Sequence, residues 1–117
     1  MRMFKLSFFL VVLFSAANGH KDVKYHSQWG QDRYLNEHIF NNKVGGVFVD
    51  IGAHDGITLS NTYFFEKNIN RTGVAFEPLS GPYEKLKASR KCVCINAAVA
   101  AERGSAAFSV RRDMRKC

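Results

Sequence analysis

The stretch V-F-V-D-I-G-A-H-D-G, residues 47–56, joins an apolar run to two glycines and two aspartates. Residues 47–51 have the β-branched and aromatic bias of a strand, and Asp50 is their only polar member. A strand that is apolar on both faces is typical of the buried interior of a parallel sheet. Gly52 and Gly56 then allow a sharp turn and a close approach of the backbone to a neighbour. The stretch therefore predicts a buried strand followed by a tight loop.

Predicted helices and strands alternate along the rest of the chain. Upstream, Ser27 is predicted to cap a helix that runs to about Phe40. Downstream, the pattern predicts a helix at about 59–67, a strand at 73–77, a helix at 80–89 with Pro82 in its first turn, a strand at 92–97 and a fourth strand at 106–110. Strands that alternate with helices imply βαβ units and a parallel sheet. We therefore predict the first half of a doubly wound α/β fold.

The composition fits one modest globular domain. The chain has 117 residues, of which 46% are hydrophobic, and its formal net charge is +7. Much of the positive excess lies at the two ends. No basic stripe is interleaved with aromatic residues, so a solvated basic tail is favoured over a nucleic-acid interface. Cys92, Cys94 and Cys117 lack metal-binding spacing, and the first two are predicted to be free thiols buried in a strand. We predict no metal site.

The first 19 residues have the pattern of a secretory signal peptide. Basic residues precede an apolar stretch at 6–17, and small residues follow it. The stretch is short for a membrane span, and an uncleaved signal anchor or a buried N-terminal helix are the alternatives. Asn70-Arg71-Thr72 is an N-glycosylation sequon, which supports entry to the secretory pathway only weakly. The predicted divisions are a signal peptide or anchor at 1–19, a lead-in and helix at 20–44, an α/β domain at 45–110 and a basic tail at 111–117.

The loop at 52–56 discriminates between ligand classes by its spacing. A mononucleotide phosphate loop needs a Lys-Ser/Thr pair that does not follow Gly56, and a dinucleotide fingerprint needs G-x-G-x-x-G where this loop has G-x-x-x-G. S-adenosylmethionine carries no phosphate, and Asp50, Gly52 and Gly56 suit its methionine part. Glu77, at the end of the next strand, is suited to ribose hydroxyls. The alternative is that Asp50 and Asp55 cap the following helix and that Glu77 is a solvated strand end.

Four segments resemble the FkbM family of S-adenosylmethionine-dependent methyltransferases: S-Q-W-G-Q-D at 27–32, G-G-V-F-V-D-I-G-A-H-D-G-I-T-L-S-N-T at 45–62, G-V-A-F-E-P at 73–78 and I-N-A-A-V-A at 95–100. The similarity covers about residues 27–110. It implies a Rossmann-like methyltransferase fold, S-adenosylmethionine as cofactor and methyl transfer to an oxygen of a small molecule or sugar. By position, the resemblance assigns the methionine part to Asp50, Gly52, Ala53 and Gly56, the ribose to Glu77, and the surroundings of the adenine to Asn96 or Ala97.

The chain departs from the family pattern after about residue 110. Family members continue with further strands and a segment resembling K-I-D-x-E-G, which is missing here. No catalytic residue is assigned, because no motif places a general base and a lone loop histidine such as His54 is more often a bystander. The S-Q-x-G-Q-D opening and the L-S-N-T stretch also resemble Star-type animal proteins, which are membrane-anchored, non-catalytic relatives that act in ligand trafficking. The sequence thus predicts the cofactor-binding half of a methyltransferase, with a Star-like secretory-pathway protein as the alternative.

Overall fold

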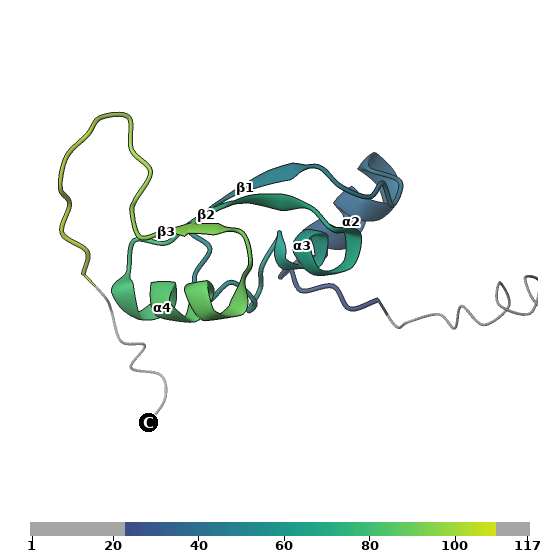
Figure 1. Cartoon of the computed structure of the whole chain (residues 1–117), viewed down its shortest axis with the longest axis horizontal. Helices are drawn as coiled ribbons and strands as arrows, with labels where there is room; N and C mark the ends of the chain where they lie inside the picture. The colour runs from purple at the N-terminus through teal and green to yellow at the C-terminus, as the bar shows by residue number, and fades with distance from the viewer. Residues whose placement is uncertain (1–22, 110–117) are drawn as a thin grey trace, which may run out of the picture.

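The computed structural model describes residues 23–109, which form a small α/β domain around a three-stranded, open parallel sheet (Figure 1). The strands β1 (Val47–Ile51), β2 (Thr72–Phe76) and β3 (Val93–Ile95) lie in the order β1-β2-β3. Both pairings are parallel, and β1 and β2 run level with each other from end to end. The predicted parallel sheet is confirmed. The predicted leader at 1–19 and basic tail at 111–117 lie outside the described residues.

Helices α3 (Tyr63–Ile69) and α4 (Ser80–Ser89) connect successive strands and lie on the same side of the sheet (Figure 1). The bounds of α4 agree with the prediction. Helix α3 was expected to begin at Leu59, which is wrong. Leu59 has a left-handed backbone (φ 56°) and pairs with Ser27 in an isolated parallel bridge, so the helix cannot begin before this bridge ends.

The N-terminal helix is shorter and more irregular than predicted. It consists of α2 (Gln31–Tyr34) and the π-helical segment η1 (Leu35–Ile39). Ser27 is not the N-cap residue, because Gly30 holds that position, but the Ser27 hydroxyl oxygen accepts a hydrogen bond of 3.3 Å from the Asp32 amide in the first turn. The same hydroxyl donates to the buried Asp32 carboxylate at 2.6 Å. Burial raises the pKa of Asp32, but the hydrogen bonds that it accepts outweigh this effect and lower it.

Two small apolar clusters form the core of the described residues. The first lies between the sheet and α4 and contains Ala53, Ala75 and Leu86. The second centres on α3 and contains Phe64, Phe65 and Ile69, against which Tyr25, Leu35 and Phe40 pack. Aromatic residues dominate the second cluster, and the rings of Phe64 and Phe65 meet edge to face at 5.4 Å. The first cluster attaches α4 to the sheet, and the second joins α3 to η1 and to the N-terminal segment.

The outer face of the sheet, opposite α3 and α4, is open within the described residues. Alternation along the strands places aliphatic side chains there, with exposed fractions of 75% for Val47, 63% for Val49, 64% for Ile51 and 60% for Val93. The prediction that β1 is buried on both faces is therefore wrong. β1 is an edge strand, and among its side chains only Phe48 is buried. An apolar pattern shows which residues can be buried. Val47, Val49 and Ile51 stay exposed because no other layer covers this face within the described residues.

Residues 96–109 form no strand, so the predicted fourth strand at 106–110 is wrong over its described part. The segment leaves the end of β3 and loops away from the sheet (Figure 1). A β-prone run becomes a strand only when a neighbour supplies its hydrogen bonds, and residues 106–109 pair with no strand in the described part of the chain. Cys92 and Cys94, at the other end of this region, are free thiols but only half-buried.

Candidate functional site

The carboxyl ends of β1 and β2 meet at one edge of the sheet. Ile51 pairs with Phe76 at the last position of both strands. Directly beyond this pair, the amides of Gly52 and Ala53 both donate to the Phe76 carbonyl, each at 2.9 Å. The loop at 52–56, here called the glycine loop, is therefore attached to the end of β2 from its first residue.

Glu77 links the glycine loop to the ends of β2 and β3. Its side chain is buried, with the residue 5% exposed, and Oε2 accepts a hydrogen bond of 2.8 Å from the His54 amide. Oε1 accepts a hydrogen bond of 2.9 Å from the Leu79 amide. The Glu77 carbonyl accepts another, of 2.8 Å, from the Asn96 side chain. Glu77 thus binds the glycine loop through its carboxylate and the segment after β3 through its backbone carbonyl.

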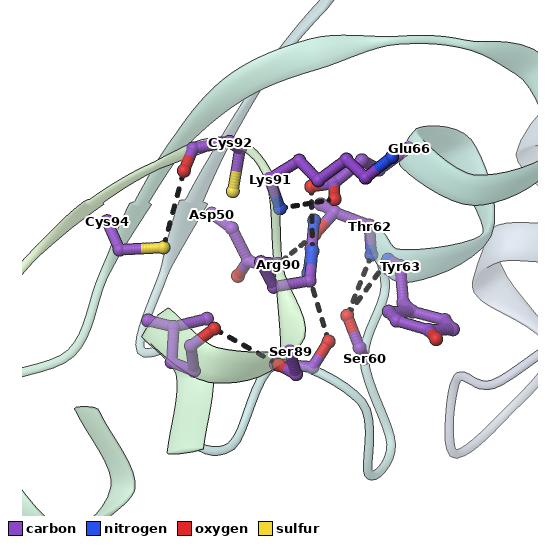
Figure 2. A network of polar contacts seen from close by, with 12 residues as sticks. Asp50, Ser60, Thr62, Tyr63, Glu66, Ser89, Arg90, Lys91, Cys92 and Cys94 are labelled. Carbon is purple, nitrogen blue, oxygen red and sulfur yellow. Dashed lines mark hydrogen bonds and ion pairs between the residues drawn. The ribbon is translucent and has the colours of Figure 1, made fainter. Parts of the chain in front are cut away.

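Asp50 faces a polar network on the inner side of the sheet (Figure 2). Its Oδ2 accepts a hydrogen bond of 2.5 Å from the Thr62 hydroxyl. The Thr62 oxygen in turn accepts one of 3.0 Å from Nη2 of Arg90, whose Nη1 donates to the Gly56 carbonyl, also at 3.0 Å. Nε of Arg90 forms a buried ion pair of 2.8 Å with Glu66. Arg90 therefore joins Asp50, the glycine loop and α3 in one network.

Asp55 stabilises the turn that ends the glycine loop. One carboxylate oxygen accepts the amides of Ile57 and Thr58, and the other accepts the Thr58 hydroxyl at 2.6 Å. Partial burial raises the pKa of Asp55, but these hydrogen bonds together outweigh it and lower the pKa to about 2. The alternative that Asp55 caps the following helix is therefore wrong, because Asp55 closes its own turn and α3 begins only at Tyr63.

The two glycines of the loop have different surroundings. A Cβ on Gly56 would lie 2.8 Å from side-chain atoms of Leu86, Ser89 and Arg90, so Gly56 lets α4 pack directly against the loop. A Cβ on Gly52 would meet no atom within 4 Å. Both glycines have positive φ, 80° and 81°. Gly52 therefore faces open space, whereas Gly56 faces the core.

Two cavities lie along this edge of the sheet. One of about 420 Å³ is lined by the predicted residues Asp50, Gly52 and Ala53, together with His54 and residues 58–61. Another, of about 800 Å³, is lined by Asn96, Ala97 and the segment that follows β3. Both volumes are within the range of small-molecule sites, roughly 300–1,000 Å³. Glu77 lines neither cavity, but it bonds to His54 beside the first and to Asn96 beside the second.

The structure thus places all six predicted cofactor residues at one edge of the sheet. Asp50, Gly52 and Ala53 line the first cavity and Asn96 lines the second, whereas Gly56 and Glu77 line neither. Sequence reasoning missed Thr62 and Arg90, which orient Asp50 and the loop. Thr62 is the last residue of the L-S-N-T segment. That segment contributes to the family resemblance, but its sequence does not indicate what Thr62 does. Arg90 leaves no local signal, because its partners lie 24 to 34 positions away in the sequence.

Residues 23–109 contain no cluster of His, Cys, Asp and Glu that could hold a metal ion. No helix in this part of the chain has the length and apolar character needed to cross a membrane. A scan against protein-family models and searches of the curated proteins and of the solved structures returned no match to this chain.

Proposed function

We propose that this chain binds S-adenosylmethionine at the carboxyl edge of its sheet, as the cofactor-binding half of an FkbM-type, Rossmann-like methyltransferase. The proposed reaction is methyl transfer to an oxygen of a small-molecule or sugar acceptor. One observation carries the proposal. The acid that directly follows β2, Glu77, is hydrogen-bonded to the glycine loop that follows β1, next to a cavity of about 420 Å³. A carboxylate and an open loop at adjacent strand ends suit a nucleoside ligand.

The hydrogen bonds of the glycine loop favour a ligand without phosphates. A phosphate cradle presents free backbone amides to its ligand. In this loop the amides of Gly52 and Ala53 donate to the Phe76 carbonyl, and the His54 amide donates to Glu77. These three donors are already used inside the protein. S-adenosylmethionine is cationic at its sulfur and carries no phosphate that would need such a cradle.

Asp50 and Gly52 offer the first cavity what the methionine part requires. Thr62 occupies only Oδ2 of Asp50, and Oδ1 accepts no hydrogen bond within residues 23–109. A carboxylate oxygen beside the cavity can accept a hydrogen bond from the ammonium group of the ligand. Gly52 lets the ligand approach the backbone, because no side chain stands there.

The state of Glu77 favours the second candidate, a non-catalytic Star-like protein of the secretory pathway. Both carboxylate oxygens already accept backbone amides, and the residue is only 5% exposed. An acid in this state acts as a structural link. Each oxygen keeps a further lone pair for a ribose hydroxyl, but the residue has little contact with solvent. The lumen, where the proposed leader would direct the chain, is also not a compartment rich in S-adenosylmethionine.

Calorimetric titration with S-adenosylmethionine and with S-adenosylhomocysteine separates the two candidates. The methyltransferase proposal expects both to bind, and it expects Glu77→Ala to weaken binding more than His54→Ala. The His54 substitution is the matched control, because it removes an exposed side chain but keeps the amide that bonds Glu77. Circular dichroism verifies that each variant is folded. A folded wild-type chain that gives no binding heat with either compound would leave the Star-like candidate.

A further inference from the structure

A third cavity lies at the opposite edge of the sheet, where β2 and β3 begin. Its volume is about 520 Å³, and its walls come from the end of α3, from Thr72 and Gly73 of β2, and from residues 91–93. The residues that line it include three cationic ones: Lys67, Arg71 and Lys91. The cavity shares no lining residue with the proposed cofactor site.

The only acid in the walls of this cavity is already neutralised. Glu66 is held by Nε of Arg90 through Oε2 and by the Lys91 amide through Oε1, both at 2.8 Å (Figure 2). Burial raises the pKa of Glu66, but these bonds outweigh it and lower the pKa, so its charge is matched by that of Arg90. Burial raises the pKa of the neighbouring Cys92 thiol to about 12, so the sulfur adds no negative charge at pH 7. The positive charge of the cavity is therefore uncompensated by its own walls.

Arg71 is fixed in place without an anionic partner. Its guanidinium carbon lies 4.0 Å from the ring centre of Phe40 and 5.1 Å from that of Phe65. Nε is buried and has no hydrogen-bond partner in the described part of the chain. Neither Arg71 nor the two lysines form an ion pair among residues 23–109. Because Nε is buried, only the terminal nitrogens of this guanidinium are left to bind an oxyanion, and its stacking means that little rotamer entropy remains to be lost on binding.

We propose that this cavity binds the phosphate or sulfate monoester group of a small molecule. A planar guanidinium recognises two oxygens of such a group at once, and two lysines supply the remaining charge for a dianion. The cavity exceeds the size of the anion alone, which leaves room for a part of the molecule that carries it, such as a sugar ring. The site is independent of the proposed methyltransferase function, because it lies at the other edge of the sheet.

Amide chemical shifts followed by NMR test the proposal with inorganic phosphate, inorganic sulfate and glucose 6-phosphate as probes. Sodium chloride at matched ionic strength and glucose are the controls. Saturable shifts are expected at Arg71, Thr72, Lys91 and Val93, with glucose 6-phosphate binding more tightly than inorganic phosphate. Equal chemical-shift changes with sodium chloride would show that they arise from ionic screening and not from binding, which would overturn the proposal. Tighter binding of the inorganic ions than of glucose 6-phosphate would overturn the part that concerns an attached group.

Exposed lysines supply variants that leave the fold intact. Lys67→Gln and Lys91→Gln each remove one charge-assisted hydrogen bond, so each is expected to weaken binding of glucose 6-phosphate by about tenfold. Lys87→Gln is the matched control, because Lys87 is exposed on α4 and does not line the cavity. Equal effects at Lys87 and Lys91 would refute a specific site. S-adenosylmethionine titrated into the same samples reports on the other edge, so failure of either proposal is recognised separately.

Discussion

The guanidinium of Arg90 donates a hydrogen bond of 3.0 Å to the carbonyl of Gly56, 34 positions earlier in the chain. The same side chain is completely buried and forms its ion pair with Glu66, which is itself 6% exposed. A buried guanidinium is stable only if its donors are satisfied, and the described residues satisfy three of them, on Nε, Nη1 and Nη2. The glycine loop is therefore held at Gly56 by Arg90 and at His54 by Glu77.

Arg90→Met is expected to destabilise the domain by about 3–5 kcal/mol, because it leaves the Glu66 carboxylate buried without its cation. The free energy of unfolding from urea denaturation measures the effect. Arg33→Gln is the matched control, since it breaks an exposed arginine–glutamate pair, and its expected effect is below about 1 kcal/mol. The double variant Arg90→Met with Glu66→Leu should recover part of the loss, because no charge is then buried alone. Equal losses for the Arg90 and Arg33 variants would contradict the structural role of this network.

Gly56→Ala and Gly52→Ala are expected to separate stability from ligand binding. Both replace a glycine with positive φ, which costs about 1–2 kcal/mol of backbone strain. Gly56→Ala also forces a methyl group against α4, which adds about 1–3 kcal/mol. Gly52→Ala directs its methyl group into open space beside the first cavity, so it should affect S-adenosylmethionine affinity more strongly than Gly56→Ala. Urea denaturation and calorimetry measure the two quantities, and a larger stability loss for Gly52→Ala would contradict the packing described here.

Local patterns were sufficient to predict the three parallel strands, helix α4 and the position of Glu77. In each case the signal is contained within about ten residues, as in the strand at 73–77 that Pro78 terminates. The errors arose where a distant partner decides the outcome. Leu59 is predicted to be helical, but it forms an isolated parallel bridge with Ser27. The predicted fourth strand has no neighbouring strand to pair with in the described part of the chain.

In the candidate site, too, local features could be predicted from the sequence, whereas contacts between distant segments could not. The sequence predicts that the residues of this site lie near strand ends, because their positions relative to the strands are local features. Their interactions were not found, because the network of Arg90 depends on segments brought together only by folding. Gly56 illustrates the difference well. The sequence indicates that a glycine is needed there, but only the structure shows that the reason is contact with α4.

The pKa of Asp55, lowered to about 2, predicts a component of stability that disappears in acid. A carboxyl group whose pKa is lower in the folded than in the unfolded state stabilises the fold above its unfolded pKa, and this stabilisation is lost as the pH falls from about 4 to about 2. Wild-type protein and Asp55→Asn should differ by at most about 2 kcal/mol at pH 7, and the difference should vanish near pH 2. Urea denaturation across this pH range measures it. A difference that does not change with pH would show that the Asp55 carboxylate is not stabilised by its turn.

The proposed sequon lies where an oligosaccharide could be attached. Asn70 is exposed at the end of α3, and its left-handed backbone (φ 54°) turns the chain toward β2. Chain produced in a secretory host should carry a glycan at Asn70 that an N-glycosidase removes, as seen by mass spectrometry. Thr72→Ala should abolish the modification, whereas Thr72→Ser should retain it, because a hydroxyl at this position is required. Both variants leave Asn70 in place, so the strained turn is undisturbed. Unmodified wild-type protein in the medium would contradict the glycosylation proposal, and wild-type protein confined to the cytosol would contradict the secretory one.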